Sequence, residues 1–444
     1  MADALEMLKK ILILFPKDWD RQRFSTPELR AHYQFFFEGF DLFTFPQNAR
    51  LIAFDLYRYV DRLADKYRRV GLDGVLSNNE QFGALTAALL AERLGLPGLK
   101  PRTVLIAQHK FYAREALGMV LPELNPEYCV IPYTVKSERE IALRFPFFVK
   151  PVKATYSVLA RRVDSFGELR EHLSFGPLET FIIKRLTKPF NDVLKATPEF
   201  PISADHLIAE SLLSGTQVSV EGVVLDGKVR VLGMVDAIMY PGTQAFLRWD
   251  YPSRLPPASR ERVIAASKRV VETLQYNHGF FNLEFMVDAE TGGIKLIEIN
   301  PRMAAQFSDL FDKVHALNLH RIALDLSCGA TPDLEPRQGR NRVAASFVFR
   351  KFDGTSLHGP PTGGKLEWLA RFDPDAHLML YLKKGRSLAR EMKWLGSHRY
   401  AVLNMGAESE AALREKHRRI KQELDFETGC DELPEAVSAP HDAL

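Results

Sequence analysis

Two neighbouring runs, 280–288 and 294–302, hold the acidic and amide side chains in this chain that are best suited to chemistry. Both runs alternate apolar and polar residues, which is the pattern of a β-strand with one face in a core. The residues between them include two glycines, so the runs are expected to form a hairpin. If the hairpin pairs symmetrically about Thr291, Glu284 and Glu298 lie directly opposite each other on its polar face.

Two facing carboxylates need a neutralising partner. Side chains opposite each other in an antiparallel pair have Cβ atoms about 5 Å apart, and like charges so placed are destabilising. Glu284, Glu298, the amide oxygen of Asn300 and phosphate oxygens together form the all-oxygen shell that Mg²⁺ takes in nucleotide sites. Arg302 follows at the strand end, where it is positioned for an anion. The residues therefore predict a magnesium and phosphate site.

The alternative is a solvated amphipathic hairpin whose acidic face meets water. The second strand, Ile-Lys-Leu-Ile-Glu-Ile-Asn, is too apolar for a freely exposed edge. We therefore expect Glu298 to lie in a largely buried sheet and to need a partner.

A Leu-Glu-Phe run around Glu284 and a Leu-Ile-Glu-Ile-Asn-Pro-Arg run ending at Arg302 resemble the metal-binding strands of the ATP-grasp superfamily. The branch concerned holds biotin carboxylase, carbamoyl-phosphate synthase and the L-amino acid ligases. The resemblance implies that Glu284, Glu298 and Asn300 bind Mg²⁺ between the ATP phosphates. It also implies that Arg302 steadies the acyl phosphate or the tetrahedral intermediate. It covers about residues 100–330 well and the flanks loosely.

Composition is ordinary for a globular protein, with 444 residues, 46% of them hydrophobic and 26% charged. A net charge of +3 demands neither a nucleic-acid partner nor a membrane partner. Cys129, Cys328 and Cys430 are far apart and lack metal-ligand spacing, which fits a reducing cytosol. The acids before the apolar run 11–15 argue against a secretory signal, and no apolar stretch approaches the roughly 20 residues of a membrane span. We expect a cytoplasmic protein.

The first part of the chain, 1–108, has the pattern of a Rossmann-like, doubly wound α/β domain. Short apolar runs at 8–15 and 74–77 predict buried parallel strands, and the segments 49–69 and 83–95 predict helices. A GxGxxG fingerprint is absent from it.

The resemblance implies that such a domain precedes the nucleotide fold and contributes to a carboxylate pocket. The natural candidates are Asn78, Asn79 and Glu80, at the carboxyl end of the second strand. A polar helix cap is the equally favoured alternative for these residues.

The runs 146–152 and 156–163 predict a hairpin of a small lid sheet, followed by a helix at 165–173. Lys150 lies inside an apolar strand, where an anion partner or an exposed sheet edge would explain it. It resembles the phosphate-binding lysine of the family, and Lys110 resembles the lysine that opens the fold and contacts the nucleotide phosphates. A solvated helix face is the alternative for Lys110.

The loop after Lys150 departs from the family, which commonly has glycines there so that backbone amides wrap the phosphates. The hydroxyls of Thr155 and Ser157 are candidates to substitute for those amides.

The run 207–213 resembles the hinge that offers backbone groups to adenine, with Glu210 and Leu212 at the matching positions. The strands that follow, 216–224 and 226–232, resemble the central strands of the fold. Polar residues on the first of them that could approach ribose or phosphate are Gln217, Ser219 and Glu221.

The aromatic loop 239–254 precedes a helix at 258–276. In the ligase branch the equivalent stretch lines the acceptor pocket, so Arg248 and Arg254 are candidates to bind a carboxylate. Solvent-exposed arginines are the alternative.

The expected organisation is an α/β N-terminal domain at 1–108, a two-lobed α+β ATP-grasp fold at 109–335 with its lid at about 140–210, and a small α+β C-terminal module at 336–428. Residues 429–444, rich in Pro, Ala and acids, are expected to be a disordered tail.

The resemblance implies an ATP-dependent ligase that activates a carboxylate as an acyl phosphate and joins it to an amine, with release of ADP and phosphate. The implied cofactors are ATP and Mg²⁺, or alternatively Mn²⁺, and the implied partners are a small carboxylate and a small amine. A homodimer is left open. Three alternatives remain: a biotin-carboxylase-like enzyme, a kinase of this fold that phosphorylates a hydroxyl, and a nucleotide-binding regulator without turnover.

Overall fold

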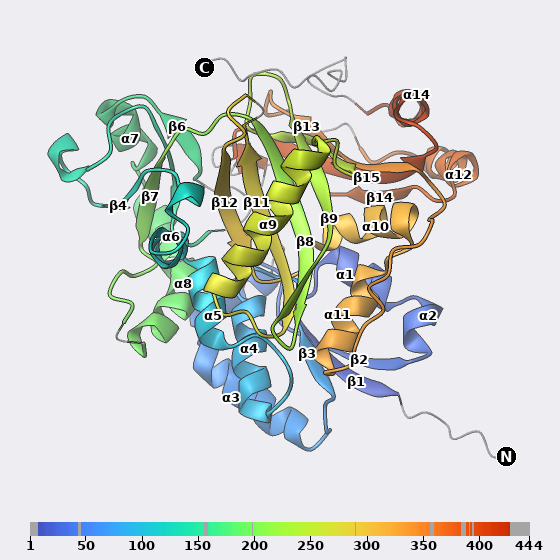
Figure 1. Cartoon of the computed structure of the whole chain (residues 1–444), viewed down its shortest axis with the longest axis horizontal. Coiled ribbons are helices and arrows are strands. Elements are labelled where there is room, and N and C mark those ends of the chain that lie inside the picture. Colours follow the sequence, from blue (N-terminus) through green and yellow to red (C-terminus); the bar gives the residue numbers. More distant parts are fainter. Residues whose placement is uncertain are drawn as a thin grey trace.

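The computed structural model describes residues 8–42, 46–154, 159–197, 199–288, 290–355, 359–382, 388–389, 391–392 and 395–426. Within these residues the strands form three sheets, with a central sheet flanked by an N-terminal layer and a separate lid (Figure 1).

The N-terminal layer is a parallel sheet of order β2-β1-β3, covered by helices. Its strands are β1 (Lys9–Leu14), β2 (Tyr33–Glu38) and β3 (Gly74–Leu76). The predicted parallel pairing of the first and third strands is confirmed, with Ile11 opposite Gly74. The strand β2 was missed because its face is only partly buried and its sequence does not alternate clearly.

The helices of this layer are α1 (Asp18–Phe24), α2 (Pro27–Arg30), α3 (Leu56–Arg68) and α4 (Gly83–Leu94). The predicted helix at 49–69 is two elements, the 3₁₀ helix η1 (Gln47–Ala53) and α3. The break occurs because Asp55 caps α3, its side chain accepting from the Arg58 amide at 3.0 Å. The helix α4 ends as expected at Gly95, which has a positive φ of 68°.

The lid is a four-stranded sheet of order β4-β7-β5-β6. Its strands are β4 (Tyr128–Pro132), β5 (Phe147–Pro151), β6 (Arg161–Val163) and β7 (His206–Ser211). The predicted pairing of β5 with β6 is confirmed. Its helices are η3 (Glu138–Glu140), α7 (Phe166–His172) and α8 (Pro177–Lys195), and the lid is joined to the N-terminal layer through α5 (Pro101–Gln108), α6 (Lys110–Gly118) and η2 (Pro122–Leu124).

The central sheet has eight strands in the order β12-β11-β8-β9-β10-β13-β15-β14. Their bounds are β8 (Thr216–Leu225), β9 (Lys228–Met239), β10 (Phe246–Tyr251), β11 (Gly279–Val287), β12 (Ile294–Asn300), β13 (Val343–Lys351), β14 (His377–Leu380) and β15 (His398–Ala407). The last three strands were expected in a C-terminal module, and they extend the central sheet through the pairing of β10 with β13.

Helices cover both faces of this sheet (Figure 1). On one face α9 (Pro257–Thr273) packs on β9 and β11, and α14 (Glu410–Glu423) packs on β13 and β15. On the other face α10 (Ser308–His315) packs on β13 and β15, and α11 (Leu319–Ser327) reaches β3 and β11. The remaining elements are η4 (Ala305–Phe307) and α12 (Gly363–Phe372).

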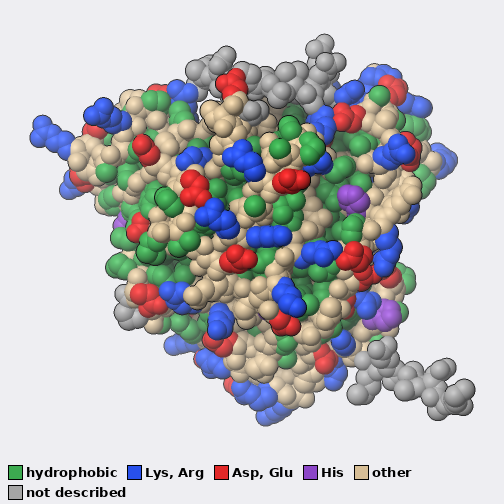
Figure 2. All heavy atoms as spheres, viewed as in Figure 1, with side chains coloured by type: hydrophobic (Ala, Val, Ile, Leu, Met, Phe, Trp, Pro, Cys, Tyr) green, Lys and Arg blue, Asp and Glu red, His purple; other side chains and the backbone are tan. Residues whose placement is uncertain are grey.

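Figure 2 shows the face that carries α9, where acidic and basic side chains are interspersed among apolar ones. This face therefore does not present a surface of one sign. In the described part of the chain, no helix combines the length and apolarity needed to cross a membrane. The expected tail at 429–444 lies outside the described residues.

Candidate active site

The facing carboxylates predicted from the hairpin are present. In the ladder between β11 and β12, Glu284 pairs with Glu298 and Asn282 pairs with Asn300. The symmetry about Thr291 ends there, because a bulge follows Glu284 and moves the next pairs by one residue. The strand β12 is an edge strand, but η2, α5 and α6 pack along it, so it is not a freely exposed edge.

The ionisation of Glu284 reflects this crowding. Burial, followed by the negative charge of Glu298, raises the pKa of Glu284 from 4.5 to about 7. Its only hydrogen-bond donor among the described residues is Gln217, whose Nε2 donates to Oε2 at 2.9 Å. A cation near Glu284 and Glu298 would relieve this energetic cost.

The amide row beside the carboxylates is fully buried. Asn300 Nδ2 donates to Asn282 Oδ1 at 3.0 Å, and Asn282 Nδ2 donates at 2.7 Å to both Ser219 Oγ and Glu221 Oε1. Asn300 Oδ1 is buried and accepts no hydrogen bond from the described residues. A buried acceptor without a donor is rare in native proteins, and here it is beside the two carboxylates.

Glu221 adds a carboxyl group to this row of buried polar side chains. Its Oε1 also accepts from the Ala304 amide at 3.2 Å, its side chain has no exposed surface, and burial raises its pKa to about 8. The predicted contact of Glu221 with the nucleotide stays a prediction, and Gln217 and Ser219 are committed to Glu284 and Asn282 respectively.

The two predicted lysines reach the carboxylate face from different elements. Lys110, the first residue of α6, lies 2.8 Å from Glu298 Oε1 and is only 8% exposed. Burial acts to lower the pKa of Lys110, but Glu298, together with Glu80 and Glu210, outweighs burial and raises that pKa. The solvated-helix alternative for Lys110 is therefore wrong.

Lys150 on β5 pairs with Glu210 Oε2 at 2.7 Å, so a buried carboxylate holds it and the exposed-edge alternative is wrong. Arg114 Nε donates to Glu210 Oε1 at 2.9 Å. Burial acts to raise the pKa of Glu210, but Arg114 and Lys150 outweigh it and lower that pKa. Both cations also donate to the carbonyl of Ile297, at 2.9 and 3.2 Å, in the bulge of β12.

The predicted hinge lies between the lid and the central sheet. Glu210 is in β7, and Leu212 follows the end of this strand with 39% of its surface exposed. The side chain of Glu210 is committed to ion pairs, so only its backbone remains for the predicted adenine contact. Ser157 and Thr155 lie outside the described residues.

Arg302 meets the N-terminal layer at Glu80. Arg302 Nη2 lies 2.6 Å from Glu80 Oε2, and both side chains are largely buried. Burial would raise the pKa of Glu80, but Arg302, Lys153 and Lys110 outweigh it and lower that pKa. Glu80 therefore lies beside Arg302, and its predicted place in a carboxylate pocket stays a prediction.

The neighbours of Glu80 do other work. Asn79 Oδ1 accepts from the amides of Phe82, the N-cap residue of α4, and Gly83, its first residue, so Asn79 binds the start of this helix, close to the polar-cap alternative considered for it. Asn78 donates to buried Asp20 at 2.7 Å. Neither side chain makes a contact with Arg302 that the structure records.

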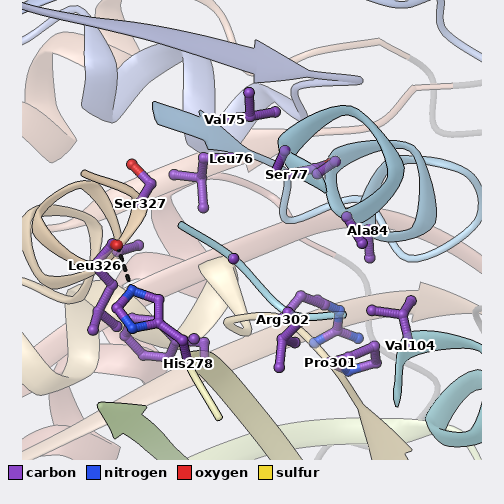
Figure 3. Close-up of a pocket in the computed structure, with 18 of the residues that line it drawn as sticks. Val75, Leu76, Ser77, Ala84, Val104, His278, Pro301, Arg302, Leu326 and Ser327 are labelled. Atoms are coloured by element: carbon purple, nitrogen blue, oxygen red, sulfur yellow. Dashed lines mark hydrogen bonds between the residues drawn. The ribbon is translucent and has the colours of Figure 1, made fainter. Parts of the chain in front are cut away.

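Arg302 also forms part of the wall of a mostly apolar cavity of about 80 Å³ between the N-terminal layer and the start of β11. Figure 3 shows Arg302 beside Pro301 and Val104 at one end of this cavity. At the other end the His278 ring nitrogen Nε2 lies 2.6 Å from the Leu326 carbonyl.

The two arginines expected in the acceptor pocket are on the wrong face of the sheet. Ser219 pairs with Glu284 and with Val235, so the next residue on β9, Asp236, points to the opposite face. Asp236 pairs with Asp250, which holds Arg248 and Arg254 at 2.9 and 3.0 Å. This is the face of α14, where Arg254 also pairs with Glu410. Strand alternation therefore separates Arg248 and Arg254 from the carboxylates.

Residues that sequence reasoning missed are Arg114 and Lys153. Arg114 stands four residues after Lys110 on the same helix, a spacing that places both on one face and could have indicated it. Lys153 lies just after β5, in the loop that follows Lys150; its side chain is 3% exposed and its Nζ donates to the Glu80 carbonyl at 2.9 Å.

Part of this chain is similar to a known protein family. A family model described as an ATP-grasp domain matches residues 187–306, the segment that contains Glu210, Glu284, Glu298, Asn300 and Arg302. This chain contains an ATP-grasp domain. A group of three or more His, Cys, Asp or Glu side chains that could hold a metal is not found among the described residues.

The similarity extends over the whole fold. Carnosine synthase 1 of Gallus gallus is 26% identical over 321 residues, which is 68% of this chain and 32% of that protein. An L-amino acid ligase from Bacillus licheniformis superposes with a TM-score of 0.68 at 19% identity, covering 94% of this chain and 98% of that one.

An N5-carboxyaminoimidazole synthase from Aspergillus clavatus, solved with ADP and its ribonucleotide, gives a TM-score of 0.62 at 15% identity and covers 94% and 99% of the two chains. The whole chain, including its N-terminal layer and the C-terminal strands, thus has the multidomain ATP-grasp architecture, as expected from the sequence.

Proposed function

We propose that this chain is an ATP-dependent ligase that activates a small carboxylate as an acyl phosphate and joins it to an amine. The observation that carries the proposal is the contact between Arg302, at the end of the carboxylate strand, and Glu80, at the carboxyl end of β3. It brings the crevice of the α/β layer, where such sheets bind ligands, to the predicted phosphate site. The names of two similar proteins, a carnosine synthase and an L-amino acid ligase, support the same activity.

The residues present fit a divalent cation. Glu284 and Glu298 face each other, Glu284 has a raised pKa, and Asn300 Oδ1 has no donor among the described residues. These three side chains would hold Mg²⁺ or Mn²⁺, which supplies neutralisation of phosphate charge when bound.

The roles of the remaining residues follow from their charges. Lys110 and Lys150 present ammonium groups to the phosphates on the Glu298 side of the site. The hinge at Glu210 and Leu212 holds adenine through its backbone. Arg302 presents a planar fork to the oxygens of the acyl phosphate and of the oxyanion formed on attack.

The reaction has two steps. An oxygen of the carboxylate forms a bond to the γ-phosphorus while the bond to the β–γ bridging oxygen breaks, and ADP leaves. The amine nitrogen then bonds to the acyl carbon and loses one proton to solvent, while the bond from that carbon to the phosphate-bearing oxygen breaks, so phosphate leaves with this oxygen. We also propose that the domain boundaries lie at 108/109 and 335/336. We further propose a cytoplasmic location and small molecules as substrates. A homodimer remains a prediction.

The test has two parts. Phosphate release from ATP, measured across a matrix of amino acids and small acids with product mass spectrometry, identifies the substrates. With the acid labelled by oxygen-18, a ligase passes one label into the released phosphate, and the amine is required for sustained turnover. Unlabelled phosphate together with a phosphorylated product contradicts the ligase and indicates a kinase.

A further inference from the structure

Lys153 is a buried cation that the proposed function does not use. It follows β5 in the segment where the family commonly has glycines, yet its side chain is 3% exposed. The described residues contain no carboxylate within ion-pair distance of its Nζ. Its neighbours are the Glu80 carbonyl, at 2.9 Å, and the ring of Phe190, whose centroid lies 5.5 Å away.

These neighbours do not compensate a buried ammonium. A carbonyl and an aromatic face are weaker partners than an anion, and an ion taken out of water needs a counter-charge. The Glu80 carbonyl also has a second donor, because Gln108 Nε2 lies 2.8 Å from it. The bond from Lys153 is therefore not needed to satisfy this carbonyl, and the ammonium remains available for a ligand.

The position of Lys153 indicates which ligand. Glu80 holds Lys153 through its carbonyl and Arg302 through its carboxylate, so both cations lie around one residue at the crevice of the N-terminal layer. Lys110 and Lys150 are instead held by Glu298 and Glu210, at the β12 side. Lys153 and Arg302 thus lie on the Glu80 side of the site, where the carboxylic acid substrate is proposed to bind.

We propose that Lys153, together with Arg302, binds the phosphoryl oxygens once the phosphoryl group has passed to the acid substrate. This inference rests on the proposed function for the identity of the acyl phosphate. Lys153 stays protonated in both steps. The phosphoryl group that it binds leaves as the released phosphate.

The pKa of Lys153 supports this assignment. Burial lowers that pKa to about 8; the charges of Lys110 and Arg302 act in the same direction, and those of Glu80 and Glu298 oppose them without cancelling the effect of burial. A bound oxyanion favours the charged form and raises it again. Binding of an oxyanion near pH 8 should therefore take up a proton at Lys153.

The experiment measures binding of inorganic phosphate to the protein saturated with MgADP, by calorimetry, and needs no knowledge of the acid or the amine. Lys153→Met should weaken phosphate binding by about tenfold or more, the loss of one charge-assisted contact, while the affinity for MgADP changes less than about twofold. Lys150→Met should instead weaken MgADP. Lys188→Met, a half-exposed lysine of α8, is the control for loss of charge alone and should change neither affinity.

Two further variants separate charge from structure. Lys153→Gln keeps a donor for the Glu80 carbonyl and loses the charge, so it should lose phosphate binding as Lys153→Met does. Lys153→Arg should keep most of it. With sulfate, which does not titrate near pH 8, the wild type should take up a proton on binding and Lys153→Gln should not, as the dependence of the binding enthalpy on buffer ionisation shows.

Three outcomes overturn the proposal: wild type that binds no phosphate, Lys153→Met and Lys153→Gln that bind it normally, or equal losses of phosphate and MgADP affinity. The last would assign Lys153 to the nucleotide. A failure of the ligase reaction is seen separately, in the oxygen-18 experiment, and leaves the binding result standing.

Discussion

Replacing Glu284 by glutamine should stabilise the metal-free protein at alkaline pH and abolish most of its ATP turnover. The side chain keeps its shape and its hydrogen bond to Gln217, and the variant lacks the charge that faces Glu298. These two effects have opposite signs, so they distinguish a metal ligand from a structural glutamate.

The magnitude follows from the pKa of Glu284, which is raised from 4.5 to about 7. Between these pH values the folded protein holds a proton that the unfolded chain has released, so stability falls as pH rises through this window. Below about pH 4.5 the penalty is absent, and above about pH 7 it is complete. At about 1.4 kcal/mol per pKa unit the full penalty is about 3 kcal/mol, or about 2 kcal/mol allowing for the partial exposure of the side chain.

The assay is urea unfolding of wild type and Glu284→Gln at pH 5 and pH 8.5, with and without MgATP. The variant should be more stable by about 2–3 kcal/mol at pH 8.5 without metal, and nearly equal to wild type at pH 5. MgATP should stabilise the wild type much more than the variant. ATP turnover should fall by at least about 10–100-fold, the range seen when groups supporting a metal are removed.

Glu298→Gln is the matched control on the opposite strand. It also relieves the like-charge pair, but it removes the partner of buried Lys110. It should therefore lose stability at both pH values, by about 3 kcal/mol, because an unpaired buried ammonium is left. The reasoning is refuted if Glu284→Gln is less stable than wild type at pH 8.5 without metal, or if it turns over ATP normally.

Two other perturbations test the cations around the site. Arg302→Lys should slow amide formation more than it weakens ATP binding, because lysine keeps the charge and loses the planar fork, and equal effects in single-turnover and binding assays would contradict this role. Glu210→Gln leaves Arg114 and Lys150 without their carboxylate and should cost about 3–5 kcal/mol in urea unfolding, whereas the exposed-pair control Asp65→Asn should cost under about 1 kcal/mol. A small loss in Glu210→Gln would show that its ion pairs are solvated.

The carboxylate face could be predicted because it is local. Strand alternation has a period of two, and a short hairpin leaves little freedom of register, so Glu284 and Glu298 were placed opposite each other by their spacing alone. The bulge after Glu284 was not predictable in this way. The bulge depends on packing along β12. It leaves the carbonyl of Ile297 free to accept hydrogen bonds from Arg114 and Lys150.

The surroundings of that face were decided by the tertiary structure. Glu80 and Arg302 are separated by 222 residues, and no pattern in either segment indicates the other. Lys153 lies in a loop in the sequence, and only the packing of α8 and the N-terminal layer against it shows that its side chain is buried.

The sequence by itself determined that Glu284 and Glu298 face each other, since this depends on residue types at short spacing, and the architecture followed from the resemblance of these strands to the ATP-grasp superfamily. Which cations meet those strands, and that Arg248 and Arg254 lie on the opposite face, depend on how distant segments fold together. Burial and ion pairing are properties of that three-dimensional arrangement, so only the fold could show that Lys110, Lys150 and Lys153 have three different partners.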